Sequence, residues 1–137
     1  MVIAANGPLN GGGASVSLTD RRILLVEDEG MLALDLELAL EDAGARPLGP
    51  VMRVAQGLEL LAADREAIDA AILDLDLHGE DVYPIADSLV ERGVPFLFHT
   101  GHGRRSELQA RYPDAPVFLK PSMVEKLLAC VADLADG

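Results

Sequence analysis

Five short apolar runs recur along this chain, and segments with helical periodicity separate them. Two of the runs, Ile23–Val26 and Ala70–Leu73, show no alternation of apolar and polar residues, a pattern typical of strands that are covered on both faces of a parallel sheet. A third lies around Leu48, where Pro47 and Pro50 remove backbone donors and favour an edge position. The remaining two apolar runs are Val94–Thr100 and Ala115–Leu119.

Each run is followed by a segment rich in helix-forming residues. Asp81 is expected to cap the third helix, and Ser122 with Glu125 forms a capping-box pattern at the start of the fifth. On the first helix, Leu36 and Leu40 fall on the arc that should face the sheet. The expected helices are 30–43, 54–63, 81 to about 92, 104–111 and 122 onwards. Successive β-α units predict an α/β fold with a doubly wound parallel sheet and helices on both faces.

Composition limits the number of domains and the classes of partner. A chain of 137 residues, half of them hydrophobic, suffices for one domain with its own core. Residues 1–20 contain Asn6-Gly7-Pro8 and three successive glycines, and we expect a flexible tail there, ahead of a single domain over 21–137. The formal charge of −12 argues against nucleic acid or an anionic membrane as a partner, because both attract positive surfaces.

Cysteine usage and hydropathy indicate a compartment. Cys130 is the single cysteine, so the chain can form no intramolecular disulfide. The sequence shows neither a signal-peptide pattern nor an apolar run of bilayer-spanning length. We therefore expect a cytoplasmic protein.

Polar side chains stand where four of the expected strands end. Glu27 and Asp28 follow the first strand, Asp74 follows the third, Thr100 ends the fourth and Lys120 follows the fifth. Because the carboxyl ends of parallel strands meet at one edge of a sheet, we expect these side chains to converge. Each has an ordinary explanation when taken alone, such as acidic residues at a helix N-terminus. Their joint occurrence at four strand ends predicts a functional site.

The residue types in this set suit phosphoryl transfer. Asp28 and Asp74 offer oxygen ligands for Mg²⁺, which takes one or two carboxylates and keeps waters for a phosphate. Asp74 can act as a nucleophile, Lys120 can neutralise charge on the transferred oxygens, and Thr100 can donate its hydroxyl. Asp76 adds a further acid beside the predicted site.

These motifs resemble the receiver (CheY-like) domains of response regulators in two-component signalling. The resemblance covers the chain from about Arg21 onwards, and it implies a flavodoxin-like sheet of five strands in the order 2-1-3-4-5. The matching segments are Leu25–Glu29, Leu73-Asp74, Thr100 and Lys120-Pro121.

The resemblance also implies a role for each site residue. Asp74 would be the phosphoacceptor, and Thr100 and Lys120 would contact the phosphoryl group. Mg²⁺ would be the cofactor. The residues expected to hold it, directly, through a backbone carbonyl or through water, are Asp28, Asp74, Asp76 and Glu27.

The segment Phe96–Gly103 is similar to the signature of the FATGUY receivers, a mainly alphaproteobacterial branch of the family. His99 and His102 differ from its alanine and aromatic positions. His78 stands where many receivers have a proline, and Val117 stands where many have a switch tyrosine or phenylalanine. An account based on a rotating ring at that position therefore cannot apply, and we expect ordering of the segment after Thr100 to replace it.

The resemblance implies partners rather than an attached output domain. The chain is expected to be a stand-alone receiver, phosphorylated by a sensor histidine kinase or a histidine phosphotransfer protein and read by an unidentified downstream protein. A homodimer is left open. Leu34 and Leu38, which with Met31 lie outside the core stripe of the first helix, are candidate contacts for the kinase.

Two alternative functions compete with that of a phosphorylated receiver. Asp74-Leu75-Asp76 is similar to the DxD motif of haloacid-dehalogenase-like phosphatases, but that motif follows the first strand of its fold, and here another acid-ended strand precedes it. A degenerate receiver that binds partners without being phosphorylated is disfavoured, because the expected site residues are all present. The sequence thus predicts a signalling domain and not a turnover enzyme.

Overall fold

The fold is built on one parallel sheet of five strands. The computed structural model describes residues 16–101 and 104–137. The strands lie in the order β2-β1-β3-β6-β7, and all neighbours are parallel. They are β1 (Arg22–Val26), β2 (Arg46–Val51), β3 (Ala70–Leu73), β6 (Phe96–Thr100) and β7 (Val117–Leu119). The predicted flavodoxin-like order is confirmed, with the proline-containing strand at an edge.

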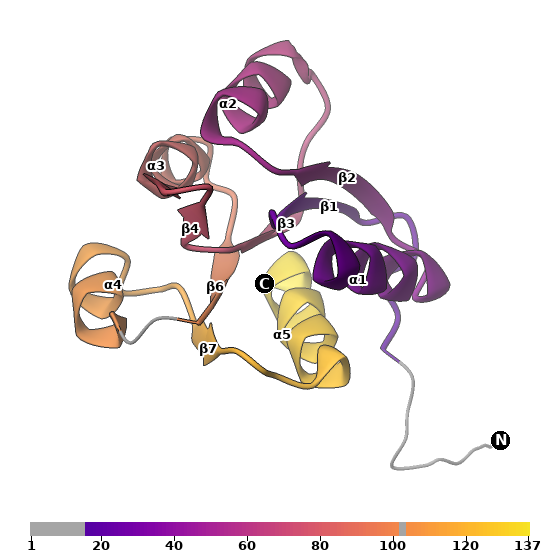
Figure 1. The fold of residues 1–137 in the computed structure, drawn as a ribbon. Helices are drawn as coiled ribbons and strands as arrows, with labels where there is room; N and C mark the ends of the chain where they lie inside the picture. Colours follow the sequence, from indigo (N-terminus) through magenta and orange to yellow (C-terminus); the bar gives the residue numbers. More distant parts are fainter. Residues whose placement is uncertain (1–15, 102–103) are drawn as a thin grey trace, which may run out of the picture.

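Helices cover both faces of the sheet (Figure 1). Helices α1 (Gly30–Asp42) and α5 (Val124–Asp136) pack on one face, and α2 (Val54–Ala63), α3 (Tyr83–Glu91) and α4 (Arg105–Arg111) pack on the other. Successive residues of a strand point to opposite faces, so each central strand contributes to both cores. This explains why the strand sequences do not alternate. None of the helices in the described ranges combines the length and the apolar character needed to cross a bilayer.

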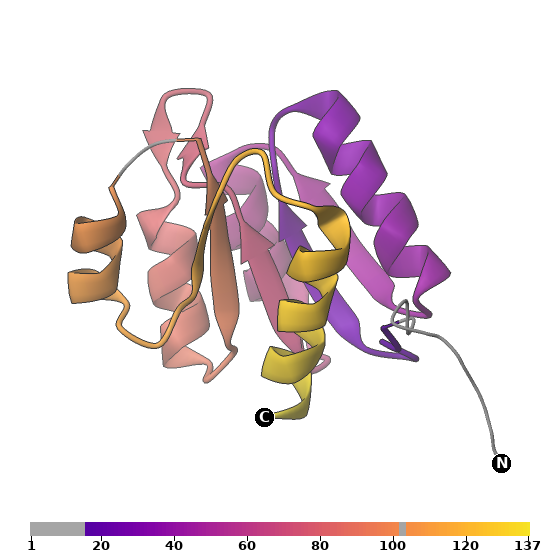
Figure 2. The ribbon, with the colours of Figure 1, turned by 90° about the horizontal axis from the view of Figure 1, so that it is seen from below.

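The carboxyl ends of the strands gather the loops that carry the predicted site. A short antiparallel hairpin, β4 (Asp76–Leu77) with β5 (Glu80–Asp81), follows β3 at this end. Figure 2 shows the hairpin, the start of α1 and the turn between β7 and α5 at the same end of the molecule. Loops that are remote in sequence are therefore neighbours in space.

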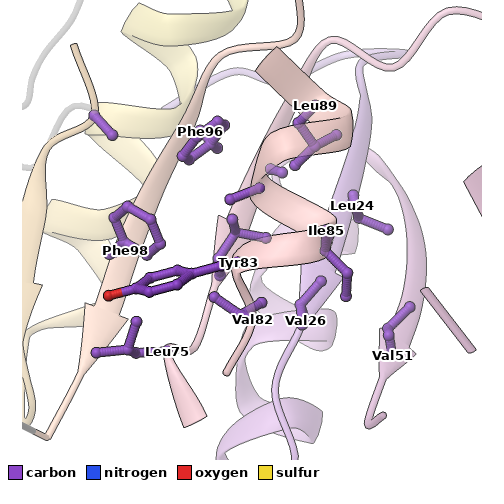
Figure 3. Packing of buried hydrophobic residues seen from close by; sticks show 14 of the residues in the cluster. Leu24, Val26, Val51, Leu75, Val82, Tyr83, Ile85, Leu89, Phe96 and Phe98 are labelled. Carbon is purple, nitrogen blue, oxygen red and sulfur yellow. The ribbon is translucent and has the colours of Figure 1, made fainter. Parts of the chain in front are cut away.

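Four aromatic rings join α3 and the end of α4 to β6. In Figure 3 the ring of Tyr83 points toward Phe98 within the buried cluster. The Tyr112 ring centroid lies 5.8 Å from that of Tyr83, 5.7 Å from that of Phe96 and 5.5 Å from that of Phe98. These spacings are those of favourable tilted and edge-to-face pairs.

Polar groups of the same tyrosines tie α3 to α4. The Tyr83 hydroxyl donates to Glu107 Oε2 at 2.5 Å, and the Tyr112 hydroxyl donates to Asp87 Oδ1 at 2.6 Å. The Arg111 guanidinium carbon lies 4.0 Å from the centroid of the Tyr83 ring, close enough for a cation–π contact. The short helix α4 thus owes its position to side chains of α3.

The folded unit begins earlier than the sequence suggested. Leu18 is 1% exposed and packs in the cluster under α1 and α5. Its N–H donates to the carbonyl of Ala43 at 2.8 Å, and its own carbonyl accepts from Arg21. The prediction of a flexible tail up to residue 20 is therefore wrong for residues 18–20, because burial of Leu18 anchors them. Val16 also packs against this cluster, whereas residues 1–15 of the predicted tail lie outside the described residues, and so does His102.

Both predicted helix caps are also wrong. Helix α3 begins at Tyr83 without a side-chain cap, because Asp81 belongs to β5 and forms an ion pair with Arg104 at 2.9 Å. No side chain caps α5 either, and Ser122 Oγ donates instead to the carbonyl of Leu119 at 2.6 Å. In both cases the side-chain oxygen found another partner in the tertiary structure.

Candidate functional site

Three carboxylates meet at the carboxyl ends of β1 and β3. Val26 pairs with Leu73, so the residues that follow them lie side by side, and the Asp74 N–H donates to the carbonyl of Val26 at 2.8 Å. Glu27, Asp28 and Asp74 each offer an oxygen, and these oxygens lie within 4.8 Å of one another. Glu27 is 1% exposed and Asp74 is 6% exposed.

The ammonium group of Lys120 reaches this acid group from the end of β7. Its Nζ lies 3.1 Å from the Glu27 carboxylate and donates to Asp74 Oδ2 at 3.3 Å. The backbone of Lys120 is held by a hydrogen bond from its N–H to the carbonyl of Thr100 at 2.8 Å, and its peptide bond to Pro121 is cis. One cation therefore bridges two buried carboxylates.

The pocket holds more negative than positive groups, and its electrostatics reflect this. Burial, and then the charge of Glu27, raise the pKa of Asp74 to about 7, although Lys120 acts in the opposite direction. Burial alone would lower the pKa of Lys120, but Asp74 and Glu27 together raise it above its ordinary value. The ammonium is therefore charged at neutral pH. The pKa of Asp74 lies close to neutral pH, so its carboxyl group is only partly ionised there.

Thr100 and Asp76 occupy different surroundings. Thr100 is the last residue of β6 and is fully buried at the same end of the sheet as Asp74. Asp76 lies in β4, where its Oδ1 accepts a hydrogen bond from the Gly79 N–H at 2.9 Å. Within the described ranges, the group of mutually close carboxylates does not include the Asp76 side chain.

The acid group fits a hard divalent cation. Mg²⁺ takes octahedral oxygen ligands at about 2.1 Å, so oxygens around it lie about 3 to 4 Å apart. The oxygens of Glu27, Asp28 and Asp74 lie within 4.8 Å of one another, which is close to that spacing. Oxygen-only donors favour Mg²⁺ over metals that prefer nitrogen or sulfur.

A contact to Asp28 was missed by reasoning from the sequence. His78 and Gly79 form the two-residue turn of the β4–β5 hairpin, with φ of 52° and 86°. The His78 N–H donates to Asp28 Oδ2 at 2.9 Å, and its Nδ1 lies 3.8 Å from the same oxygen. Proline lacks an N–H and cannot adopt this φ. The sequence signal for this contact was therefore His78 itself, which stands where many receivers have a proline.

The solvent-facing side of α1 carries the predicted contact residues. Leu34 is 48% exposed, Leu38 is 50% exposed and Met31 is 73% exposed, whereas Leu36 and Leu40 are buried. The helical arc that the sequence assigned to solvent is confirmed. The role of Leu34 and Leu38 in binding a partner stays a prediction.

The fold and this site together define a flavodoxin-like α/β domain with an acid pocket at the carboxyl edge of its sheet. Neither protein-family models nor curated protein sequences match the chain. Solved structures do match. The solution structure of SdrG from Sphingomonas melonis Fr1 is 40% identical, with 82% of this chain and 96% of that chain covered and a TM-score of 0.67.

Two further structures carry the family in their names. The response regulator receiver protein from Sinorhizobium medicae WSM419 is 28% identical, with 88% of this chain and 98% of that chain covered and a TM-score of 0.74. The non-phosphorylated HemR receiver domain from Leptospira biflexa is 26% identical, with 86% and 96% covered and a TM-score of 0.73. This chain belongs to the response-regulator receiver domains, as its motifs predicted. Its assignment to the FATGUY branch stays a prediction.

Proposed function

We propose that this receiver accepts a phosphoryl group from a phosphohistidine onto Asp74. The observation that carries the proposal is the Lys120 ammonium, 3.1 Å from Glu27 and 3.3 Å from Asp74, inside a group of three carboxylates. A buried ion pair with two surplus acids stabilises a fold poorly. The free-energy cost of desolvating the charges and of repulsion between the carboxylates exceeds the attraction that one cation provides. The same arrangement suits a pocket that receives further positive charge and a phosphoryl group.

Asp74 supplies the nucleophile. One of its carboxylate oxygens forms a bond to phosphorus while the N–P bond of the phosphohistidine breaks, and the imidazole leaves with the electron pair of that bond. Lys120 balances negative charge on the transferred oxygens from the position it already holds beside Asp74. Thr100 donates its hydroxyl to one of those oxygens.

The residues that would hold Mg²⁺ are Asp28, Asp74 and the backbone carbonyl of Asp76, with Glu27 acting through water. When bound, the ion neutralises charge on the phosphoryl oxygens. Support comes from the donor set, which consists of closely spaced carboxylate oxygens. The acids also favour a divalent cation electrostatically, since it would lower the raised pKa of Asp74.

The partners follow from this chemistry. The phosphodonor is a sensor histidine kinase or a histidine phosphotransfer protein, and its contact surface includes the exposed Leu34 and Leu38 of α1. A downstream protein, or a second copy of this chain, then reads the phosphorylated state. We place these events in the cytoplasm and assign them to one domain that includes Leu18 and the predicted span 21–137.

The alternatives gain no support from the site. A phosphatase built on the Asp74-Leu75-Asp76 motif needs both carboxylates in the pocket, whereas the Asp76 carboxylate accepts from Gly79. A receiver that is never phosphorylated has no use for the surplus acids around Lys120. We therefore propose a signalling domain that loses its phosphoryl group by hydrolysis, without turnover of a small substrate.

Labelling with acetyl phosphate and Mg²⁺ tests the proposal. We expect intact-mass analysis to show one added phosphoryl group on the wild type and none on Asp74→Asn. Asp76→Asn is the matched control and should still be labelled, because only its backbone carbonyl is assigned a role. A wild type that takes no label, or an Asp74→Asn variant labelled as well as the wild type, would contradict the assignment.

A further inference from the structure

A histidine in the core lacks a hydrogen-bond partner among residues 16–101 and 104–137. His99 lies in β6 and is 1% exposed, and neither of its ring nitrogens is paired with any group in the described part of the chain. Leu97, two residues earlier on the same strand, packs in the cluster under α1 and α5. Strand alternation therefore directs His99 toward that face and away from the cluster under α3 and α4.

An apolar residue would be less costly at this position. Burial, and then the nearby charge of Lys120, lower the pKa of His99 to about 4, so the ring is neutral at physiological pH. A neutral imidazole has one N–H donor and one bare nitrogen acceptor, and leaving both unpaired in the core is unfavourable. Buried polar groups of this kind call for a partner.

The ring borders a cavity of about 250 Å³ between the start of α1 and the turn that leads from β7 into α5. Met31, Leu32 and Pro121 provide apolar walls, and the acidic residues Glu29 and Asp35 also line the cavity. The two ring nitrogens are not reached by solvent in this conformation, so an entering group has to displace a wall residue. Met31, at 73% exposed, is the least constrained of them.

The lining favours a neutral occupant. Its acidic residues Glu29 and Asp35 disfavour an anion, and a cationic side chain has no acceptor for the imidazole N–H. A neutral imidazole pairs best with a group that itself carries a donor and an acceptor, such as a carboxamide or a hydroxyl. We propose that this cavity receives an amide or hydroxyl side chain of the phosphodonor protein, and that His99 is its hydrogen-bond partner.

The position of the cavity supports a phosphodonor as the source of that side chain. Lys120 lines the cavity and also contacts Asp74, so a protein that presents a phosphohistidine to Asp74 passes over its opening. Met31 connects the opening to the exposed stripe of Leu34 and Leu38 on α1. This assignment rests on the proposed function. His99 would thus act as a specificity residue outside the reacting group.

Binding of small probes tests the chemistry of the cavity. We expect acetamide, titrated into the whole chain and followed by NMR, to shift the His99 ring and Met31 methyl signals saturably, whereas acetate and methylammonium do not. His99→Leu should abolish the shift of the Met31 methyl signal, and His99→Gln, which keeps a donor and an acceptor, should retain it. No saturable response in the wild type, an equal response in His99→Leu, or stronger binding of acetate would overturn the proposal.

Phosphotransfer tests the source of the side chain. The transmitter domains of the histidine kinases of the source organism are screened first, and the one that labels the wild type fastest is used. We expect His99→Leu to slow this transfer at least tenfold and to leave labelling by acetyl phosphate within twofold of the wild type. Unchanged transfer from the kinase, or an equal loss with both donors, would overturn a role in partner recognition.

Two further outcomes separate this inference from the proposed function. If acetyl phosphate labels the wild type but no kinase does, the phosphodonor assignment is overturned while Asp74 chemistry stands. If acetyl phosphate fails to label the wild type although acetamide binds at His99, the proposed function fails and the cavity chemistry stands.

Discussion

Lys120 Nζ donates to Asp74 Oδ2 at 3.3 Å, and the two residues come from the ends of strands that are not adjacent in the sheet. The side chain of Lys120 crosses the end of β6 to reach Asp74, and its Nζ also lies 3.1 Å from Glu27. Because this ammonium offsets two buried carboxylates, the stability of the domain should depend on it strongly.

Lys120→Met should lower the free energy of unfolding by about 3 kcal/mol, because it leaves buried carboxylates without their cation. Urea unfolding at pH 8, where Asp74 is ionised, measures the loss. The double variant Lys120→Met/Glu27→Gln should recover part of it, since one of the two carboxylates is then neutral. A single variant as stable as the wild type would show that the ion pair contributes nothing.

Mg²⁺ should raise the melting temperature of the wild type by several degrees. At ten times its Kd the ion contributes about 1.4 kcal/mol by mass action, and it relieves repulsion among Glu27, Asp28 and Asp74. Differential scanning fluorimetry with and without Mg²⁺ measures the gain. Asp28→Asn should remove most of it and Asp76→Asn should keep it. A gain of the same size in Asp28→Asn would count against the metal site.

The left-handed backbone of His78 makes its replacements unequal. His78→Gly should change stability by less than about 1 kcal/mol, because glycine adopts a φ of 52° freely and keeps the N–H that donates to Asp28. His78→Pro should cost about 2 kcal/mol, since it loses the donor and cannot adopt that φ. Thermal unfolding compares them, and equal stabilities would refute the role given to this turn.

The hydrogen bond from Tyr83 to Glu107 should limit local opening of α4. Tyr83→Phe removes the donor at 2.5 Å and should cost about 1 kcal/mol of stability. Amide hydrogen exchange should accelerate in α4, while exchange in α1, on the other face of the sheet, stays unchanged apart from the global loss. Exchange in α4 that follows the global loss alone would show that this bond does not hold the helix locally.

The buried imidazole of His99 should make the domain sensitive to acid. Its folded pKa of about 4 lies below the ordinary value of 6.5, so the unfolded state binds the proton more tightly. The free energy of unfolding therefore falls as pH decreases from about 6.5 toward 4, by at most about 1.4 kcal/mol per pH unit.

Urea unfolding of the wild type and His99→Leu between pH 7 and pH 5 measures this dependence. The variant should lose less stability than the wild type over that interval, and the two should differ little in slope above pH 7. The charged groups that line the same cavity, Lys120, Glu29 and Asp35, are identical in both proteins. Parallel curves over the whole range would contradict a buried neutral ring.

The sheet and the position of the site followed from the sequence because both depend on local pattern. Apolar runs without alternation require cover on both faces, and the strands between Ala70 and Leu73 and between Phe96 and Thr100 are indeed central. A parallel sheet brings all carboxyl ends to one edge, which placed Glu27, Asp28 and Asp74 together and brought Lys120 to them. No knowledge of side-chain geometry was needed for these inferences.

The hydrogen-bond and ion-pair partners of individual polar atoms did not follow from the sequence. Several groups compete for each atom, and only folding brings those groups close to it. Asp81 binds Arg104 and not the start of α3, and the Asp76 carboxylate binds Gly79. Leu18 belongs to the folded domain and not to the expected tail. Its burial under α1 and α5 outweighs the entropic cost of ordering residues 18–20.

By itself, the sequence determined the fold, the family and the edge at which the chemistry lies, because periodicity and strand ends are encoded residue by residue. Only the tertiary structure decided that His78 donates to Asp28 and that His99 is buried beside a cavity, with neither ring nitrogen paired to a described residue. Both depend on the packing of segments that are distant in sequence, where burial and competing hydrogen bonds set the outcome.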